Sequence, residues 1–235
     1  MKIALLGYGK MGKTIERLAV ERGHEIVLRI SEDIENADLD IADVAIDFSV
    51  PDAAFRNITT CFDKQVPVVS GTTGWLKKYD EVVELCKKKN AAFIYASNFS
   101  LGVNLFFELN KQLSQLMNKF KEYKVSIEEI HHTHKLDAPS GTAITLAEQI
   151  IENSSKTGWK LDGSKENEIP VTAKRIENVP GTHTISYDSE VDTIKIEHIA
   201  HSRDGFALGA IIAAEWLQHK KGVYSMKDVL FNVTE

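Results

Sequence analysis

The strongest constraint on the fold is a glycine pattern near the N-terminus of the chain. The apolar run Lys2–Leu6 predicts a strand, and the hexapeptide GYGKMG that follows it at Gly7–Gly12 fits the pattern G-x-G-x-x-G. Apolar residues then recur at helical spacing until Gly23, a residue type that commonly ends helices. Glu25–Ile30 is a second apolar run that predicts a strand. The first thirty residues therefore predict a complete βαβ unit.

This βαβ unit indicates a dinucleotide site. The three glycines permit a tight turn, close approach of the backbone to a pyrophosphate, and packing of helix on strand, while the helix N-terminus attracts phosphate. A glycine-rich turn without a ligand is the alternative, but the flanking strand and helix favour a nucleotide. An acidic residue ~20 positions further on suits NAD, and an arginine there suits NADP. Arg29, Ser31 and Glu32 lie in this region, so the sequence is compatible with either NADH or NADPH.

Strands and helices alternate through the first part of the chain. Parallel strands need long crossovers, which place helices over both faces of the sheet. We therefore expect an α/β fold whose first domain is a Rossmann-type, doubly wound parallel sheet. The further strands are predicted at Val44–Phe48, Val66–Ser70 and Phe93–Ala96, with helices after Pro51 and around Leu76–Lys88.

The second part of the chain has a different, α+β pattern. Its polar segment Lys156–Asn167 is expected to be an exposed loop, and two of its strands flank the polar segment Asp188–Asp192 as antiparallel neighbours. The helices are predicted at Val103–Lys121 and Thr142–Asn153, and the strands at Val125–Ile130, Thr182–Tyr187 and Thr193–Ala200.

A late apolar run suggests that the chain returns to its first domain. Leu208–Leu217 has apolar residues at helical spacing and could pack on the first sheet. We expect a dinucleotide-binding domain of residues 1–98 with 208–235, and a second domain of residues 99–207.

Composition excludes several classes of protein. With 28 Lys and Arg against 34 Asp and Glu, the 235-residue chain has a net charge of −6, which makes nucleic acid an unfavourable partner. No apolar stretch approaches the ~20 residues of a membrane span. Cys61 and Cys86 form no CxxC pair, which suits a reducing compartment. We expect a cytoplasmic protein with no membrane partner.

Two small polar loops follow predicted parallel strands. They are Gly71-Thr72-Thr73-Gly74 and Ala96-Ser97-Asn98-Phe99. Ligands of open α/β sheets bind outside the carboxyl ends of the strands, so both loops are candidates to line a nicotinamide site.

The densest group of reactive side chains lies at His131–Thr142, with the sequence HHTHKLDAPSGT. It precedes a predicted helix, whose N-terminal N–H groups would stabilise a carboxylate ligand. Solvated histidines in a polar loop are one interpretation, and a zinc site is another. Lys135 would repel a metal ion, however, and the HExxH pattern is missing. An anionic-substrate site with acid catalysis also explains the lysine.

This segment resembles the signature of the 4-hydroxy-tetrahydrodipicolinate reductases, E-x-H-H-x-x-K-x-D-x-P-S-G-T-A, starting here at Glu129. Further segments resemble family landmarks in the same order along nearly the whole chain. They are the glycine loop, Asp47-Phe48-Ser49, Gly71–Gly74, Ser97–Ser100, Gly102-Val103-Asn104, Pro180-Gly181-Thr182-His183 and His201-Ser202-Arg203.

The resemblance implies a Rossmann domain that holds NADH or NADPH, and a substrate domain whose open mixed sheet commonly builds a homotetramer. The substrate would be a small dicarboxylate, reduced to tetrahydrodipicolinate for lysine biosynthesis, and no metal is implied. By residue match, His131 and Lys135 would be catalytic, and His132, Ser140, Gly141 and Thr142 would bind substrate. The cofactor would contact Gly7, Tyr8, Gly9, Lys10, Met11, Gly12, Gly71, Thr72, Thr73, Ala96, Ser97, Asn98 and Phe99.

Two other functions stay open at the level of sequence. A dehydrogenase for another small amino or dicarboxylic acid would share the glycine loop, although it would not need the segment from His131 to Thr142. A sensor that binds NAD(P)H without catalysis would leave the clustered acid and base groups unused.

Overall fold

The computed structural model describes residues 1–32 and 34–231. The chain forms two compact units, one made of Met1–Leu101 with the C-terminal segment from Asp204 onward, and one made of Gly102–Arg203. The domain borders expected from the sequence, 98/99 and 207/208, lie a few residues from these limits. Residues 232–235 of the expected first domain lie outside the described residues.

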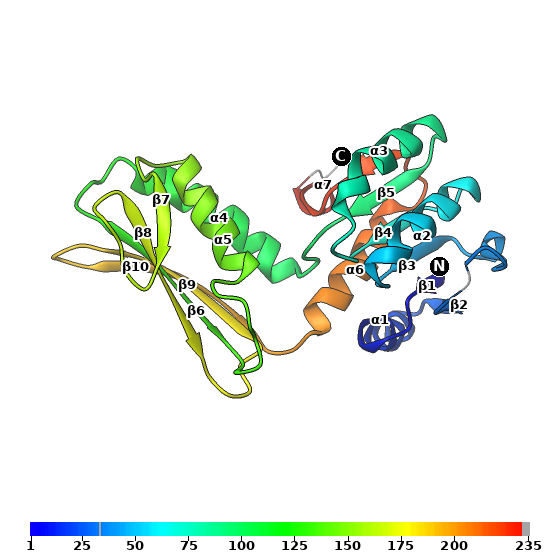
Figure 1. Ribbon diagram of the computed structural model, residues 1–235, viewed down its shortest axis with the longest axis horizontal. Helices are drawn as coiled ribbons and strands as arrows, with labels where there is room; N and C mark the ends of the chain where they lie inside the picture. Colours follow the sequence, from blue (N-terminus) through cyan, green and yellow to red (C-terminus); the bar gives the residue numbers. More distant parts are fainter. Residues whose placement is uncertain (33, 232–235) are drawn as a thin grey trace. The chain divides into compact units, whose positions relative to one another are not determined.

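The first unit is built on a six-stranded sheet in which all neighbouring strands are parallel. The strand order is β11-β5-β4-β3-β1-β2 (Figure 1), so the order reverses between β1 and β3. Ligands of such sheets bind at this reversal. The strands are β1 (Lys2–Leu6), β2 (Glu25–Ile30), β3 (Val44–Asp47), β4 (Val68–Ser70), β5 (Ala92–Tyr95) and β11 (Gly222–Tyr224).

Helices cover both faces of this sheet. Ile3 and Leu5 of β1 pack with α1 (Lys10–Glu21), α6 (Asp204–Leu217) and α7 (Met226–Phe231). Ala4 and Leu6 point to the other face and pack with α2 (Pro51–Asp63) and α3 (Tyr79–Lys88), because successive side chains of a strand alternate. The expected Rossmann-type sheet is confirmed.

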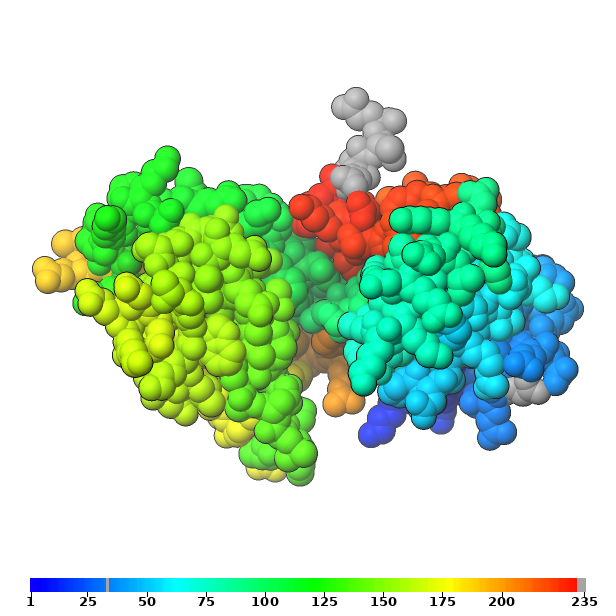
Figure 2. Space-filling model, turned by 45° about the horizontal axis from the view of Figure 1, so that its top comes forward, coloured from blue at the N-terminus to red at the C-terminus, as the bar shows by residue number. Residues whose placement is uncertain are grey.

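The C-terminal segment completes the first unit. β11 pairs in parallel with β5, and the segment lies against residues near position 90 in Figure 2 (orange to red beside teal). α6 buries seven residues, among them Gly209, where a Cβ would lie 1.7 Å from the carbonyl oxygen of Phe99. Only glycine permits this close approach.

The second unit contains a mixed sheet of five strands in the order β10-β9-β6-β8-β7 (Figure 1). β9 is antiparallel to both β10 and β6, whereas β8 is parallel to β6 and β7. The expected mixed sheet is confirmed. The strands are β6 (Lys124–His131), β7 (Gly158–Leu161), β8 (Glu168–Arg175), β9 (Gly181–Asp188) and β10 (Thr193–Ala200).

One face of the mixed sheet is covered by α4 (Leu101–Met117) and α5 (Gly141–Glu152). Val125 and Ile127 of β6 face these helices, and their strand neighbours face the other side. No helix in the described part of the second unit lies on that other side. Ile199 remains 50% exposed there, so this face is open in the single chain.

The helix expected at Val103–Lys121 is shifted by a few residues and ends at Met117. From Asn118 to Lys121 the only apolar residue is Phe120, which is 49% exposed, so this segment does not continue the buried face of the helix. α4 has 17 residues. Among the described residues, no helix combines the length and apolar character needed to cross a membrane.

The expectation that Lys156–Asn167 is entirely a loop is wrong. Gly158–Leu161 forms the edge strand β7, which pairs with β8. Trp159 and Leu161 alternate along it and pack on the core beneath α5, and the surrounding polar residues hide this short period-2 signal.

Candidate active site

The glycine loop joins β1 to α1 at the carboxyl edge of the first sheet. Gly9 is the N-cap residue of α1 and provides no side-chain hydrogen bond to the first turn. A Cβ at Gly9 would meet no atom within 4 Å, whereas a Cβ at Gly12 would lie 2.4 Å from the carbonyl oxygen of Gly7. The open space at Gly9 and the uncapped helix N-terminus fit a phosphate group. Gly12 instead serves internal packing.

Replacing Gly9 by alanine is expected to raise the dissociation constant of the reduced dinucleotide about tenfold, or about 1.4 kcal/mol. The added methyl group would occupy space that the pyrophosphate needs, while the fold has room for it. Fluorescence titration of the bound cofactor measures the change. Gly12→Ala is the matched control, since its clash should lower thermal stability. Unchanged cofactor affinity in Gly9→Ala would show that the pyrophosphate lies elsewhere.

Tyr8 belongs to a small polar cluster beside this loop. Its hydroxyl donates to the carboxylate of Glu16, which also accepts from Arg29. The Arg29 guanidinium lies 5.8 Å from the centre of the Tyr8 ring, and the pairing with Glu16 raises the pKa of Arg29. Arg29 is thus a fixed positive charge near the end of β2. In Rossmann-type domains, residues in this region contact the ribose of the cofactor. The loop residues Lys10 and Met11 are exposed and half-buried, respectively.

A buried carboxylate organises the loops after β3 and β4. Asp47 is fully buried and accepts four hydrogen bonds: from Ser49 Oγ (2.6 Å), Asn57 Nδ2 (3.0 Å), Ser70 Oγ (2.7 Å) and Thr72 Oγ1 (2.9 Å). Burial raises the pKa of Asp47, and these donors act in the opposite direction. The carboxylate therefore ties the Ser49 and Thr72 loops together.

The predicted cofactor residues of the β4 and β5 loops differ in exposure. Thr73 and Ser97 are exposed, Gly71, Ala96 and Asn98 are half-buried, and Thr72 is buried with its hydroxyl on Asp47. Gly71 lies against the ring of Phe48, where a Cβ would be 2.3 Å from the nearest ring atom. The Phe99 side chain is 1% exposed and packs on Phe48, with ring centres 5.9 Å apart. Only the backbone of Phe99 remains for a ligand.

In the second unit, three buried polar side chains meet on the helix-covered face of the sheet. Glu129 and His131 are two residues apart on β6 and so point to the same face. His183 lies directly opposite Glu129 on β9. Glu129 Oε2 is 3.6 Å from His131 Nδ1 and 3.7 Å from His183 Nε2, and the two histidine rings are 5.1 Å apart.

Lys135 lies on the loop that leaves β6. Its ammonium donates to both carboxylate oxygens of Asp137, each at 2.8 Å, and its side chain is 21% exposed. Arg175, the last residue of β8, holds this loop by donating to the carbonyl oxygens of Lys135 (3.3 Å) and Asp137 (2.6 Å). Arg175 also donates twice to Glu129 Oε1, at 3.3 Å. His132 is half-buried on the same loop.

Ser140 begins α5. Its hydroxyl accepts from the N–H of Ala143 at 3.2 Å, and its own N–H donates to Glu129 Oε2 at 3.0 Å. The first N–H groups of a helix have no partner inside it, so those of Gly141 and Thr142 remain for a ligand. Gly141 is exposed and Thr142 half-buried, which makes them accessible. This helix N-terminus is suited to bind a carboxylate.

The charges of this site are unusual. Burial lowers the pKa of His131 to about 4, and the neighbouring Lys135 and Arg175 act in the same direction, so the imidazole is neutral at pH 7. For Glu129, burial alone would raise the pKa, but the interactions with His183 and Ser140 outweigh it and hold the pKa at about 2. Neither His131 nor Glu129 therefore carries an acidic proton at neutral pH.

Acid is expected to destabilise this unit in a defined pH window. His131 takes up a proton below pH 6.5 when unfolded but only near pH 4 when folded, so the free energy of unfolding falls by about 1.4 kcal/mol per pH unit between these values. Glu129 adds a similar loss from pH 4.5 down to about 2. Urea unfolding from pH 7 to 4.5 measures this. His131→Gln should flatten the dependence, and equal slopes in both proteins would contradict the assignment.

Glu129, His131 and His183 also place ligand atoms within 4.8 Å of one another, which is near the spacing of a metal site. The carboxylate of Glu129, however, already pairs with Arg175 through one oxygen and accepts the N–H of Ser140 through the other. Arg175 adds a positive charge that opposes a cation. The absence of a metal from this site stays a prediction. Arg175, in addition to Lys135, now supports it.

Sequence reasoning assigned no role to four polar residues of these sites. Asp47 and Glu129 lie in the quoted motifs, and their position at the ends of apolar strands was the available signal. His183 also lies in a quoted segment, Pro180–His183, but only the pairing of β9 with β6 places it beside Glu129. Arg175 ends a strand that the sequence did not locate.

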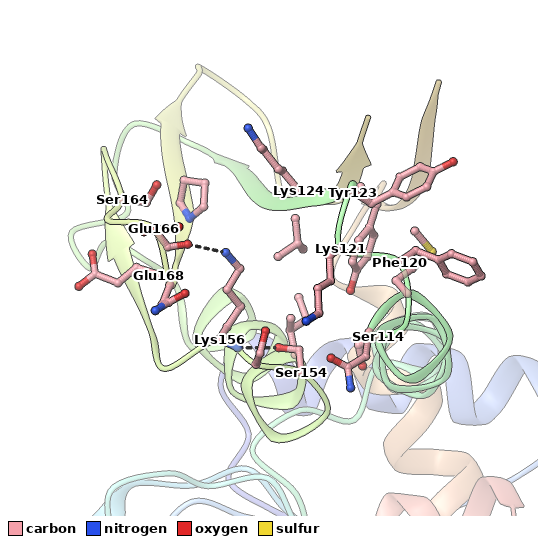
Figure 3. Close-up of a pocket in the computed structure, with 18 of the residues that line it drawn as sticks. Ser114, Phe120, Lys121, Tyr123, Lys124, Ser154, Lys156, Ser164, Glu166 and Glu168 are labelled. Atoms are coloured by element: carbon pink, nitrogen blue, oxygen red, sulfur yellow. Dashed lines mark hydrogen bonds between the residues drawn. The ribbon is translucent and has the colours of Figure 1, made fainter. Parts of the chain in front are cut away.

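A separate pocket of about 570 Å³ lies elsewhere in the second unit (Figure 3). Lys121, Lys124, Lys156 and Lys165 are among its lining residues, and the Lys156 ammonium donates to the carbonyl oxygen of Glu166. None of the predicted catalytic or substrate residues is among the described residues that line it. It is therefore not the candidate active site.

Comparisons with known proteins agree with this geometry. The family model "Dihydrodipicolinate reductase, N-terminus" matches residues 21–99, and "Dihydrodipicolinate reductase, C-terminus" matches residues 102–230. The glycine loop precedes the first match. A 4-hydroxy-tetrahydrodipicolinate reductase of Christiangramia forsetii is 63% identical over 98% of both chains. One of Thermosipho africanus is 34% identical, also over 98% of both chains.

Solved structures share the fold. A dipicolinate-bound dihydrodipicolinate reductase from Paenisporosarcina has a TM-score of 0.78 at 22% identity, over 98% of this chain and 99% of that one. A probable dehydrogenase from Thermotoga maritima has a TM-score of 0.59 at 11% identity, over 97% and 92%. Since the family models together match most of the chain and a relative is 63% identical over nearly its full length, the chain belongs to the dihydrodipicolinate reductase family.

Proposed function

We propose that the chain reduces 4-hydroxy-tetrahydrodipicolinate to tetrahydrodipicolinate with NADH or NADPH, in the diaminopimelate route to lysine. The observation that carries this proposal is the segment from His131 to Thr142. It combines an ammonium group, a neutral buried imidazole and a free helix N-terminus within the second unit. Dehydrogenases for other small acids need the glycine loop but not this combination.

The substrate carboxylates would bind at the start of α5. The N–H groups of Gly141 and Thr142, with the Ser140 hydroxyl, provide donors there, and the helix dipole favours negative charge. His132 would add a donor from the preceding loop. A dicarboxylate such as dipicolinate, which is bound in the Paenisporosarcina relative, belongs to the expected ligand class.

Lys135 would supply the proton. NADH or NADPH, when bound, would supply the hydride for an electron-poor ring carbon conjugated with an imine. Lys135 would stabilise the negative charge that develops on the ring and protonate the neighbouring carbon. His131 is neutral, so it would orient or relay this proton and not provide one of its own.

The cofactor would bind to the first unit. The phosphates would lie at Gly7–Gly12 and the N-terminus of α1, where the open space at Gly9 fits them. The loops Gly71–Thr73 and Ala96–Phe99, at the carboxyl ends of β4 and β5, would contact the nicotinamide half.

We also propose a cytoplasmic homotetramer. The open face of the mixed sheet carries half-exposed side chains such as Ile199 and the ion pair of Lys174 with Glu128. Covering this face between subunits would bury it. Both cysteines are buried free thiols, as expected for a reducing compartment. Light scattering coupled to size exclusion tests the assembly, and a monomer would reject it.

A coupled assay tests the reaction. The unstable substrate is generated in situ by the synthase that precedes the reductase, and the absorbance of NADPH and, separately, NADH is followed. Substrate-dependent loss of absorbance is expected and will show the preferred cofactor. If either cofactor binds but neither is oxidised, the chain acts on another substrate or senses the nucleotide.

A further inference from the structure

The proposed reaction leaves three buried or partly buried polar groups without a role: Glu129, Arg175 and His183. They come from three neighbouring strands, β6, β8 and β9. Glu129 is fully buried and His183 is 4% exposed. A buried carboxylate such as that of Glu129 lowers stability unless hydrogen bonds and opposite charges compensate for its lost hydration. The contacts of Glu129 therefore indicate which groups the site holds in place.

One arm of this group reaches the start of α5. His183 Nε2 lies 3.1 Å from Ser140 Oγ, and Glu129 Oε2 accepts the N–H of Ser140 at 3.0 Å. Side chains of the sheet therefore contact both the hydroxyl and the backbone N–H of Ser140. The same hydroxyl accepts the N–H of Ala143, so the position of Ser140 also sets the first turn of α5.

The other arm reaches the loop of Lys135. Arg175 donates to Glu129 Oε1 and also to the carbonyl oxygens of Lys135 and Asp137. A guanidinium has five donors in a rigid fork, which allows one side chain to hold a carboxylate and two carbonyl groups together. Lysine, a point charge on a flexible stem, cannot reproduce this geometry.

We propose that Glu129, Arg175 and His183 form a positioning network, in which the two oxygens of Glu129 link the carboxylate-binding turn at Ser140–Thr142 to the loop of Lys135. This inference rests on the proposed function. The network sets the distance between the point where substrate is held and the group that protonates it. Its two arms have separable effects, because His183 acts on the binding turn and Arg175 on the proton-donor loop.

The test measures binding and turnover separately. Dipicolinate serves as a binding probe that is not reduced, and calorimetry gives its dissociation constant. His183→Leu is expected to weaken dipicolinate binding about tenfold, while His183→Gln, which keeps a donor near the Nε2 position, stays within about threefold of the wild type. His198→Leu is the matched control, because His198 lies opposite His183 on β10 but, among the described residues, forms no hydrogen bond with Ser140.

Arg175→Lys tests the second arm. It is expected to lower kcat about tenfold with dipicolinate binding changed less than about threefold, because only the proton-donor loop shifts. The affinity for NADPH should be unchanged in every variant. If His183→Leu does not fold, the network is tested by Arg175→Lys alone, in which kcat should fall while dipicolinate binding stays nearly unchanged.

Two results would overturn the network. One is equal weakening of dipicolinate binding by the leucine and glutamine variants, which would mean that bulk and not hydrogen bonding matters. The other is a normal kcat in Arg175→Lys. A wild-type protein that binds NADPH but reduces no substrate would instead reject the proposed function, and this inference with it.

Discussion

Lys135→Ala is expected to lower kcat by ~10²–10⁴-fold, the usual contribution of a positioned general acid. The pKa is about 4 for His131 and about 2 for Glu129. Both groups are therefore deprotonated at neutral pH and cannot replace the proton of Lys135. The substitution should leave NADPH affinity unchanged, because the glycine loop belongs to the other unit. Steady-state kinetics in the coupled assay, together with cofactor titration, measures both quantities.

A matched lysine variant separates this effect from a general loss of charge. Lys160→Ala removes an exposed lysine of β7 and should retain wild-type kcat. Lys135→Arg keeps the charge but cannot release its proton at neutral pH, so it should remain nearly as slow as the alanine variant. Turnover of Lys135→Ala within about threefold of the wild type would exclude Lys135 as the proton donor.

Asp47→Ala is expected to lower the free energy of unfolding of the first unit by about 2–4 kcal/mol. Four donors converge on this fully buried carboxylate, and alanine would remove the acceptor that they share; Asn57 Nδ2 would keep a second acceptor, Ser49 Oγ. The loops of Ser49 and Thr72 would also separate, so cofactor affinity should fall with stability. Urea unfolding and fluorescence titration of NADPH measure the two effects.

Asp47→Asn is the informative control, because it preserves the shape of the side chain. The side-chain oxygen of asparagine would still accept hydrogen bonds, so the loss of stability should be smaller than for alanine. Some loss should remain, because the amide nitrogen would face two hydroxyl donors. Asp43→Ala removes an exposed-loop carboxylate next to β3 and should cost less than about 1 kcal/mol. Equal stability of the Asp47 and Asp43 variants would mean that the buried carboxylate does not organise the loops.

The first unit could be predicted from the sequence because its signals are local. Alternating side chains of β1 serve two buried faces, and the glycine loop marks where strand becomes helix. The surroundings of single predicted cofactor residues were harder to predict than the strands and helices. Phe99 was expected at the cofactor, yet its side chain lies in the core because Gly209 brings α6 against its backbone.

The second unit could be predicted only in part, because its site depends on strand pairing. The segment from His131 to Thr142 is contiguous and was found. His183 and Arg175 reach the same site from β9 and β8, more than forty residues away along the chain, as their contacts with Ser140 and Glu129 show. The sequence predicts that β9 and β10 are neighbours across the turn at Asp188–Asp192, but no spacing specifies that β8 and β9 both lie beside β6. β7 was missed because its alternation lasts only four residues.

The return of the chain to the first unit has a consequence for synthesis on the ribosome. One face of the Rossmann sheet is covered only in part by α1, and it stays incomplete until α6, with its seven buried residues, has been translated. The second unit is contiguous from Gly102 to Arg203 and has all its strands earlier. The unit that the ribosome starts first is thus the last to acquire a complete core, which reverses the usual order in which N-terminal domains fold first.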